Sequence, residues 1–328
     1  MDALASLLNG PRAQGAFLLR SMLSPPWSMR IHDEAPLTLV AIVRGHAWIN
    51  LDRGDAKRLE AGDVAIVSGP DHYRICDDPT SLPQIIIHPG QRCTTPDGQD
   101  LAKAMALGVR TWGNSADAET IMLTGTYQLA GEVSRPLLEA LPRLLVVRPD
   151  ERDCPVIPLL ASEIVKDEPG QEAVLDRVLD LLLIAVLRTW FAESGRDAPG
   201  WYQGYRDPMV GQALCLIYNN PEQPWTVGSL ASAVGVSRAS LARRFADLIG
   251  EPPMAFLTSW RLALAADLLC EPGASVGGVA EKVGYGDAFA FSTAFKRVRG
   301  ISPREHRTRA LRRERVGVDG SLHQMAAR

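Results

Sequence analysis

The side chains with the clearest chemistry lie in the segment 237–244, which reads SRASLARR. Arg243 carries a planar guanidinium whose paired N–H donors match the O6 and N7 acceptors of guanine in the major groove of DNA. The other two arginines are suited to phosphates or acidic neighbours, and the two alanines would let the segment lie deep in a groove. Each arginine alone could be a solvated surface charge, but together they favour DNA contact. The first predicted contact set is Ser237, Arg238, Ala239, Ala242, Arg243 and Arg244.

A second segment, 287–297, carries different side chains at matching positions. Phe289 takes the place of Ala239, and it either packs against its neighbours, which the pattern favours, or contacts a thymine methyl group. Thr293 takes the place of Arg243 and is a weaker base-contacting residue, so sequence preference should depend mainly on the first segment. The second predicted contact set, whose cations should hold backbone phosphates, is Ala288, Phe289, Ser292, Thr293, Lys296 and Arg297.

Both segments belong to a repeat. Residues 226–237 (TVGSLASAVGVS) return at 275–286 (SVGGVAEKVGYG), an offset of 49, and one extra residue then makes the offset 50. Each copy runs through an apolar helix, a glycine turn, a polar cap and a second apolar helix, which is the plan of a helix-turn-helix unit. We predict units at 227–248 and 276–298. The residues expected at their centres are Leu241, Phe245, Phe291 and Phe295.

The flanking pattern and the charge mark out this helical half. Residues 207–219 predict a leading helix, and 252–269 predict a helix that joins the units and would hold them roughly 34 Å apart, one turn of DNA. Residues 206–315 carry 15 Lys and Arg against 10 Asp and Glu, whereas residues 1–205 carry 19 against 27. The basic half is therefore the one expected to bind phosphate.

The first half has a β pattern followed by helices. Short apolar runs between turn residues predict strands at 17–23, 37–43, 46–51, 63–68 and 84–88, a strand pair at 119–129, and loops over 89–117. Such short strands are typical of a small antiparallel barrel or jelly roll. After them we predict a helix and a strand within 134–147, helices at 155–166 and 171–193, and a linker at 196–206. The helix at 171–193 has an apolar stripe wide enough to pack partly on the core and partly on a second copy of the chain.

Composition excludes several classes of protein. With 46% hydrophobic and 22% charged residues the chain should be globular, and no window approaches the ~20 apolar residues of a membrane span. The five cysteines show no C-x-x-C spacing, which predicts reduced, packed thiols; a redox switch at Cys76 or Cys93 is the alternative. The start of the chain shows no export signal, so we expect a cytoplasmic protein, nucleoid-associated when bound to DNA.

An ordered pattern runs through residues 207–310. It consists of Leu230-Ala231, Gly235-Val236-Ser237, the Arg261-Leu262-Ala265-Leu268-Leu269 pattern, Val279-Ala280, Val283-Gly284-Tyr285, Phe291, Phe295-Lys296 and Gly300-Ile301-Ser302-Pro303. By this pattern the segment resembles the DNA-binding domain of the AraC/XylS family of bacterial transcription regulators. It departs from the family at His306, where an aromatic residue is usual.

Residues 1–200 resemble, less strongly, the cupin-type sensor domain that precedes this DNA-binding domain in one branch of the family. Leu59, Gly62-Asp63 and the turn before His72 carry that resemblance, which implies effector sensing and dimerisation. The expected fold class is α+β and multidomain. It comprises a cupin-like antiparallel β-barrel plus helices at 1–195, a linker at 196–206, an all-α domain with two helix-turn-helix units at 207–310, a short helix at 2–9, and a disordered tail at 317–328.

The predicted barrel offers little for catalysis. Metal-dependent cupins use an H-x-H…E cluster and a further histidine, whereas His32, His46 and His72 stand apart, so we expect no catalytic residue, metal or cofactor. His72 is expected at a turn, bonded to a neighbour. A pocket between the sheets could hold a small effector. The effector or redox candidates are Trp27, His32, Trp48, His72, Tyr73, Cys76 and Cys93.

The leading hypothesis is a DNA-binding transcription regulator whose barrel senses an effector or a redox signal and dimerises. Its expected partners are double-stranded operator DNA, an unknown effector, a second copy of the chain and, if it activates, RNA polymerase. The alternative is a metal-dependent cupin enzyme fused to a DNA-binding domain.

Overall fold

The computed structural model describes residues 17–127, 133, 135–148, 155–194 and 198–309. The chain divides into two compact units. Within the described ranges, the β unit lies between residues 17 and 193 except for residues 133, 135 and 136, and the helical unit consists of those three residues, residue 194 and residues 198–309. The predicted helix at 2–9 and the predicted tail at 317–328 lie outside the described residues.

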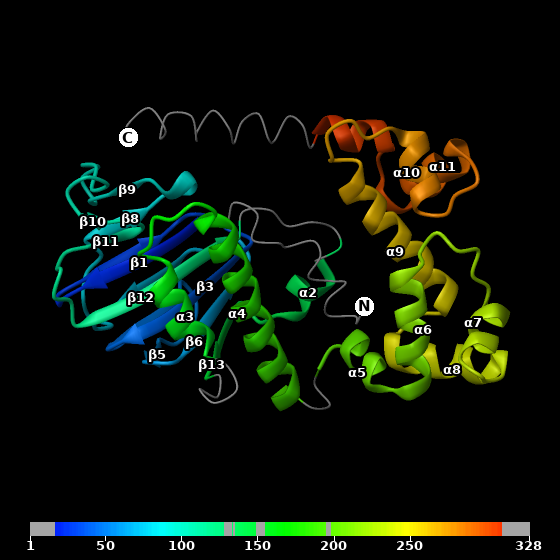
Figure 1. The fold of residues 1–328 in the computed structure, drawn as a ribbon, viewed down its shortest axis with the longest axis horizontal. Helices are drawn as coiled ribbons and strands as arrows, with labels where there is room; N and C mark the ends of the chain where they lie inside the picture. Colours follow the sequence, from blue (N-terminus) through cyan, green and yellow to red (C-terminus); the bar gives the residue numbers. More distant parts are fainter. Residues whose placement is uncertain (1–16, 128–132, 134, 149–154, 195–197, 310–328) are drawn as a thin grey trace. The chain divides into compact units, whose positions relative to one another are not determined.

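Two sheets form the β unit (Figure 1). In spatial order the seven-stranded sheet contains β10 (Ala106–Gly108), β11 (Thr111–Gly113), β1 (Phe17–Leu23), β12 (Thr120–Tyr127), β3 (Leu37–Arg44), β6 (Val64–Ser68) and β13 (Leu144–Val147). The six-stranded sheet contains β5 (Lys57–Glu60), β4 (His46–Leu51), β7 (Tyr73–Cys76), β2 (Ser28–Ile31), β8 (Ile85–Ile87) and β9 (Cys93–Thr94). Every strand predicted from the short apolar runs is present.

The sheets correct three details of the prediction. They are mixed, because β11 pairs with β1 and β8 with β2 in parallel, each returning from far along the chain rather than through a hairpin. Residues 89–117, predicted as loops, supply the short strands β9, β10 and β11. Residues 119–129 supply one strand, β12, in place of a pair. Gly125 continues this strand and does not form a turn. Because Gly125 has no side chain, Leu179 can approach it closely: a Cβ on Gly125 would lie 2.5 Å from Cδ1 of Leu179.

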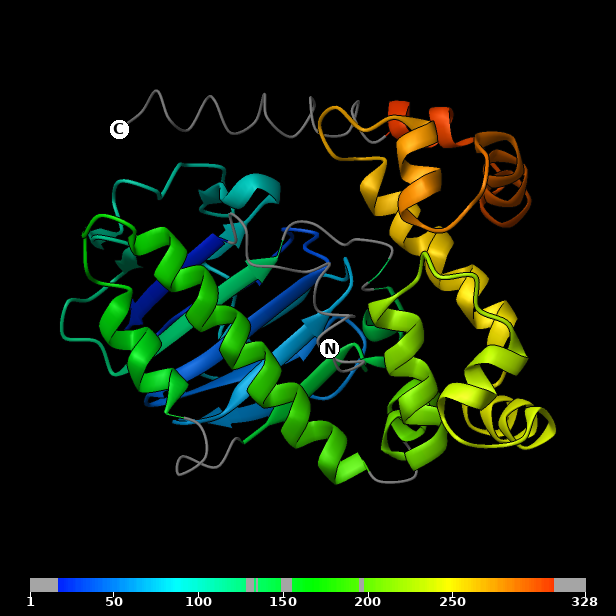
Figure 2. The same ribbon diagram turned by 45° about the vertical axis from the view of Figure 1, so that its right-hand side comes forward.

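Strands β3 and β6 are buried on both faces. Val40 and Ile42 of β3, with Ala65 and Val67 of β6, lie in the core between the sheets. The opposite face of the seven-stranded sheet is crossed by helices α3 (Val156–Glu163) and α4 (Gln171–Ser194) (Figure 2). Burial on both sides explains why these two strands are continuous apolar runs rather than alternating ones. Each fully buried aliphatic side chain contributes about 1.5–3 kcal/mol.

The regular secondary structure of the described helical unit from residue 198 onward is entirely helical. They are α5 (Gly200–Arg206), α6 (Pro208–Asn219), α7 (Val227–Ala233), α8 (Arg238–Ile249), α9 (Pro253–Leu268), α10 (Val276–Lys282) and α11 (Ala288–Arg299), with residues 303–309 also helical. The pairs α7–α8 and α10–α11 are the two predicted helix-turn-helix units, and α9 joins them. Helix α2 (Arg135–Ala140) precedes β13.

The predicted linker at 196–206 instead contains α5, which packs against α6 and α8. Two of its glycines are sites of close approach. A Cβ on Gly200 would lie 2.4 Å from the carbonyl oxygen of Leu248, and a Cβ on Gly204 would lie 2.5 Å from Cδ1 of Ile249. Glycine in this segment therefore permits packing, whereas the composition suggested flexibility.

None of the helices in the described ranges has the length and apolar character needed to cross a membrane.

Candidate nucleic-acid interface

Local capping positions the first helix-turn-helix unit. The hydroxyl of Thr226 accepts from the amide of Ser229 at 3.0 Å, and the hydroxyl of Ser229 accepts from the amide of Thr226 at 2.9 Å, so α7 begins with a capping box. Gly235 then turns the chain at φ +74°, a conformation that favours glycine. Ser237 caps α8 by accepting from the amide of Ser240 at 3.2 Å. These contacts confirm the turn and caps predicted from the repeat.

The buried face of α8 decides which side chains face outward. Leu241 and Phe245 are both fully buried, one turn apart. The opposite side presents Arg238, Ala239 and Arg243, all exposed, with Ala242 half-buried beside them. Within the described part of the chain, Arg243 has no ion pair or hydrogen-bond partner, so its guanidinium is available to a ligand.

Arg244 meets an acidic neighbour, one of the two alternatives predicted for it. Its Nε donates to Oδ2 of Asp207 at 2.9 Å, and its Nη2 lies 2.9 Å from the same oxygen as an ion pair. The other carboxylate oxygen of Asp207 caps α6, accepting from the amides of Met209 at 3.1 Å and Val210 at 3.0 Å. Arg244 therefore joins α8 to the start of α6, and its membership of the first contact set remains a prediction.

Asp207 links this contact to pH. Partial burial alone would raise the pKa of its carboxyl, but the amide donors and Arg244 outweigh burial and hold that pKa below its usual value. Since the folded-state pKa is lowered, the stabilisation is present above about pH 4, the unfolded-state pKa, and is lost as pH falls through the folded-state pKa.

We expect Asp207→Asn, which keeps a capping oxygen but loses the charge, to lower the free energy of unfolding by about 1 kcal/mol at pH 7. The difference from wild type should shrink at pH 3, and urea unfolding at both pH values measures it. Asp247→Asn, an exposed change on α8, is the matched control and should leave stability unchanged. An equal loss at pH 3 and pH 7 would contradict a charge contribution.

The second unit repeats the architecture with a different surface. Ser275 caps α10, accepting from the amide of Gly278 at 3.0 Å, and Asp287 caps α11, accepting from the amides of Phe289 and Ala290 at 2.8 Å each. Phe291 and Phe295 are fully buried, as predicted. The hydroxyl of the half-buried Ser292 donates to the carbonyl of Ala288 at 2.7 Å, which occupies its proton. The exposed members of the second contact set are Ala288, Phe289, Thr293, Lys296 and Arg297.

Phe289 overturns the favoured prediction that it packs against its neighbours. Its side chain is 82% exposed. The reason is geometric: Phe291 and Phe295 occupy the inward positions of α11, and a residue two before Phe291 lies on the opposite side of the helix. The structure therefore leaves the ring available to a ligand.

Contacts across α9 hold the two helix-turn-helix units together. Arg261 of α9 donates from Nε to the carbonyl of Pro221 at 2.6 Å and from Nη2 to that of Gln223 at 2.7 Å. At Gly284 a Cβ would lie 2.5 Å from the carbonyl oxygen of Glu222, so the turn of the second unit meets the loop ahead of the first. His306 packs edge-on to Phe295 with centroids 5.5 Å apart, which gives it the aromatic role its position implies.

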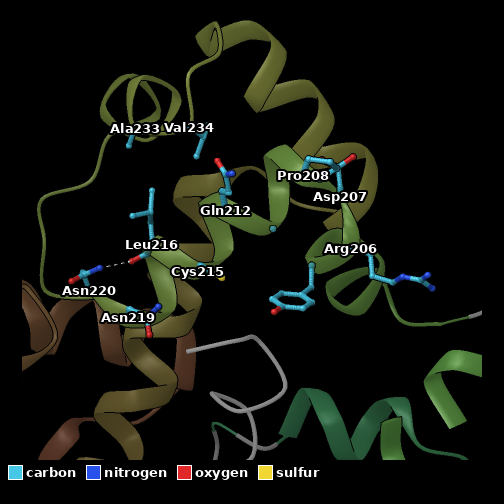
Figure 3. Close-up of a pocket in the computed structure, with 12 residues that line it drawn as sticks. Arg206, Asp207, Pro208, Gln212, Cys215, Leu216, Asn219, Asn220, Ala233 and Val234 are labelled. Atoms are coloured by element: carbon cyan, nitrogen blue, oxygen red, sulfur yellow. Dashed lines mark hydrogen bonds between the residues drawn. The ribbon is translucent and has the colours of Figure 1, made fainter. Parts of the chain in front are cut away.

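A groove in the helical unit was not anticipated from the sequence. It encloses about 600 Å³ along α6 and the end of α7 (Figure 3). Its polar side chains include Gln212 and Asn219, and Cys215, Leu216 and Val234 contribute apolar surface. None of the predicted effector candidates, which belong to the β unit, lines it.

The structure does not assemble the effector candidates into one pocket. Trp27 and Tyr73 are buried in the core between the sheets. Trp48 lies between the core residues Ala47 and Ile49 on β4, so its half-buried ring points to the other face of the sheet.

Histidine contacts also differ from the prediction. His72 stacks on His32 with ring centroids 4.1 Å apart, in place of the expected hydrogen bond to a neighbour. Nε2 of His32 accepts from Nε of Arg30 at 3.1 Å, and burial, His72 and Arg30 lower the pKa of His32. In the ranges that the structure describes, no group of three His, Cys, Asp or Glu residues is arranged to hold a metal ion.

The two candidate thiols are not activated. Burial raises the pKa of Cys76, and it raises the pKa of Cys93 to about 11, with Asp100 adding to the effect. Reactive cysteines depend on a lowered pKa, because the thiolate is the nucleophile. At neutral pH both thiols are protonated, which favours the packed-thiol interpretation.

Two known families match different parts of the chain. Residues 2–192, more than half of the chain, match a family described as Cupin, and residues 230–309 match a helix-turn-helix domain. The HTH-type transcriptional regulator AlkR of Acinetobacter baylyi is 28% identical over 94% of this chain and 99% of its own length. The chain belongs to the AraC-type transcription regulators with an N-terminal cupin domain.

Two further matches cover, respectively, nearly all and about one third of this AraC-type regulator. The transcriptional activator RclR of Escherichia coli is 27% identical over 94% of the chain and 98% of its own length. The DNA-binding domain of AdpA, solved with a target DNA, is 31% identical over 33% of the chain and 96% of that domain, with a TM-score of 0.31. The relatives are named as transcription regulators, so the protein is a DNA-binding regulator rather than an enzyme.

Proposed function

We propose that this AraC-type regulator recognises its operator chiefly through α8, with Arg243 as the principal base-contacting residue. The observation that carries the proposal is an exposed guanidinium, without a partner among the described residues, on the outward face of a helix whose opposite face is buried by Leu241 and Phe245. A guanidinium so placed can donate two parallel hydrogen bonds to guanine. Arg238, in the first turn of α8, is suited to a flanking phosphate.

The second unit supplies mainly backbone affinity in this proposal. Lys296 and Arg297 are exposed in the last turn of α11. Cations in that position neutralise phosphates and release counterions, which strengthens binding without sequence preference. The contacts of Arg261 and Gly284 with the loop at 221–223 support a fixed spacing of the two units on one face of the duplex.

Footprinting on the promoter region beside the protein's own gene tests this function. We expect a protected site at moderate salt, made of two segments about one helical turn apart. Failure to protect any site, with or without cell extract as a source of effector, would refute the proposal.

We further propose that the β unit senses a small-molecule effector and forms a homodimer. The raised pKa values of Cys76 and Cys93 favour a bound effector over thiol oxidation as the signal. RclR is named an activator; if the present regulator also activates, RNA polymerase becomes a further partner. On DNA the protein would be associated with the nucleoid.

The dimer proposal rests on the outer face of α4. Leu175, Val178 and Leu182 pack inward, whereas Val174 and Leu181 remain 42% and 48% exposed two turns apart. Two exposed aliphatic side chains spaced by seven residues form the kind of seam through which a second copy of a helix packs.

We expect Leu181→Arg to convert a dimer into a monomer in analytical ultracentrifugation, and to lower affinity for a two-site operator about 100-fold through lost avidity. The matched control is Leu82→Arg, which places the same change on an exposed leucine elsewhere in the β unit (80% exposed). A Leu181→Arg protein that remains dimeric would exclude this seam.

A further inference from the structure

Helix α11 has an unusual distribution of side chains for a helix that faces DNA. The first two turns expose Ala288, Phe289 and Thr293, and none of these can form the paired hydrogen bonds that identify a guanine or an adenine. The exposed cations lie in the last turn, at Lys296 and Arg297. Helix α8 has the reverse arrangement, since Arg238 and Arg243 lie in its first two turns.

The backbone at Phe289 is fixed by the cap of α11. Its amide and that of Ala290 donate to Oδ1 of Asp287 at 2.8 Å each, so the first turn of α11 is fixed. The side chain nevertheless remains 82% exposed, the highest value among the large hydrophobic residues of the described chain. Exposure of a ring costs hydrophobic free energy, and a ligand that covers it would recover that cost.

We propose that Phe289 is a specificity-determining residue that contacts the C5-methyl group of thymine in the DNA segment bound by the second unit. The first turns of a recognition helix meet the base edges of the major groove. Among the groups displayed there, the thymine methyl is the apolar one, and aromatic side chains contact it. The inference rests on the proposed function, and it assigns the second unit a preference for thymine in place of a purely electrostatic role.

Replacing single thymines by uracil in the protected duplex tests this inference, because uracil lacks only the methyl group. With the full-length protein we expect one or two positions at which uracil weakens binding about fourfold, the value of one buried methyl. Phe289→Ala should bind the thymine duplex about tenfold more weakly and should not respond to uracil at those positions. Phe289→Leu should retain part of the response.

Val298→Ala is the matched control, because Val298 is also exposed on α11 (51%) but lies in its last turn; it should respond to uracil like the wild type. The inference is overturned if uracil has no effect on the wild type, or if Phe289→Ala responds as the wild type does. It is also overturned if Phe289→Ala keeps normal DNA affinity but fails in transcription with purified RNA polymerase, which would indicate a protein contact. A wild-type protein without any specific site would refute the proposed function as well.

Discussion

Arg243→Ala is expected to remove most of the regulator's preference for its operator while leaving non-specific DNA binding nearly unchanged. One bidentate contact to guanine contributes about 1–3 kcal/mol of discrimination, which corresponds to roughly 5- to 150-fold in relative affinity. Arg243 is suited to this because it is exposed and has no partner in the part of the chain that the structure describes, whereas its neighbour Arg244 is bound to Asp207. Competition between operator and random duplex measures the change.

Arg243→Lys separates shape from charge. Lysine keeps the positive charge but loses the planar fork, so this variant should lose operator preference and retain the salt dependence of binding. By contrast, Lys296→Ala should weaken binding to all duplexes alike and reduce the slope of log affinity against log salt by about 0.9, the value of one phosphate contact. If both alanine variants lose affinity with unchanged preference, the assignment of base contact to α8 is wrong.

Phe245→Ala is expected to cost about 3–5 kcal/mol of stability in the helical unit. Phe245 is fully buried and meets Phe256 of α9 at a centroid distance of 5.6 Å, so its removal leaves a cavity between α8 and α9. Urea unfolding followed by circular dichroism measures the loss as a shift of the transition relative to the wild type.

The same substitution at Phe289 provides the control for Phe245→Ala. Phe289 is 82% exposed, so Phe289→Ala should leave the unfolding transition within about 0.5 kcal/mol of the wild type. Comparable destabilisation by both variants would mean that the two phenylalanines do not occupy opposite faces of their helices as described.

Much of the helical unit was predictable from local patterns. Caps at Thr226, Ser237 and Ser275 satisfy amides only a few residues away, so their effect is written into short stretches of sequence. The repeat adds a second constraint, because two copies with the same apolar spacing must bury the same positions. The strands were predictable for a similar reason, although their neighbours in the sheets were not.

Properties that depend on distant residues were not predictable in this way. Arg244 pairs with Asp207, which is 37 positions away in the sequence. Gly204 packs against Ile249, although its composition predicted that this segment was a linker. Trp48 lies on the face of β4 that points away from the core, whereas Trp27 lies in the core. The pairing of the strands decides which face of β4 meets the core. The parallel pairs of β1 with β11 and β2 with β8 are likewise long-range.

The sequence by itself determined that the chain carries two helix-turn-helix units after a β-rich segment, because periodicity, caps and turns act over a few residues. The tertiary structure decided which cations and rings remain available to DNA. A side chain is available only when nothing folded from elsewhere covers or pairs with it, and that depends on packing across the whole unit. Among the described residues, the side chains of Arg243 and Phe289 are exposed and free of such partners, whereas Arg244 is paired with Asp207.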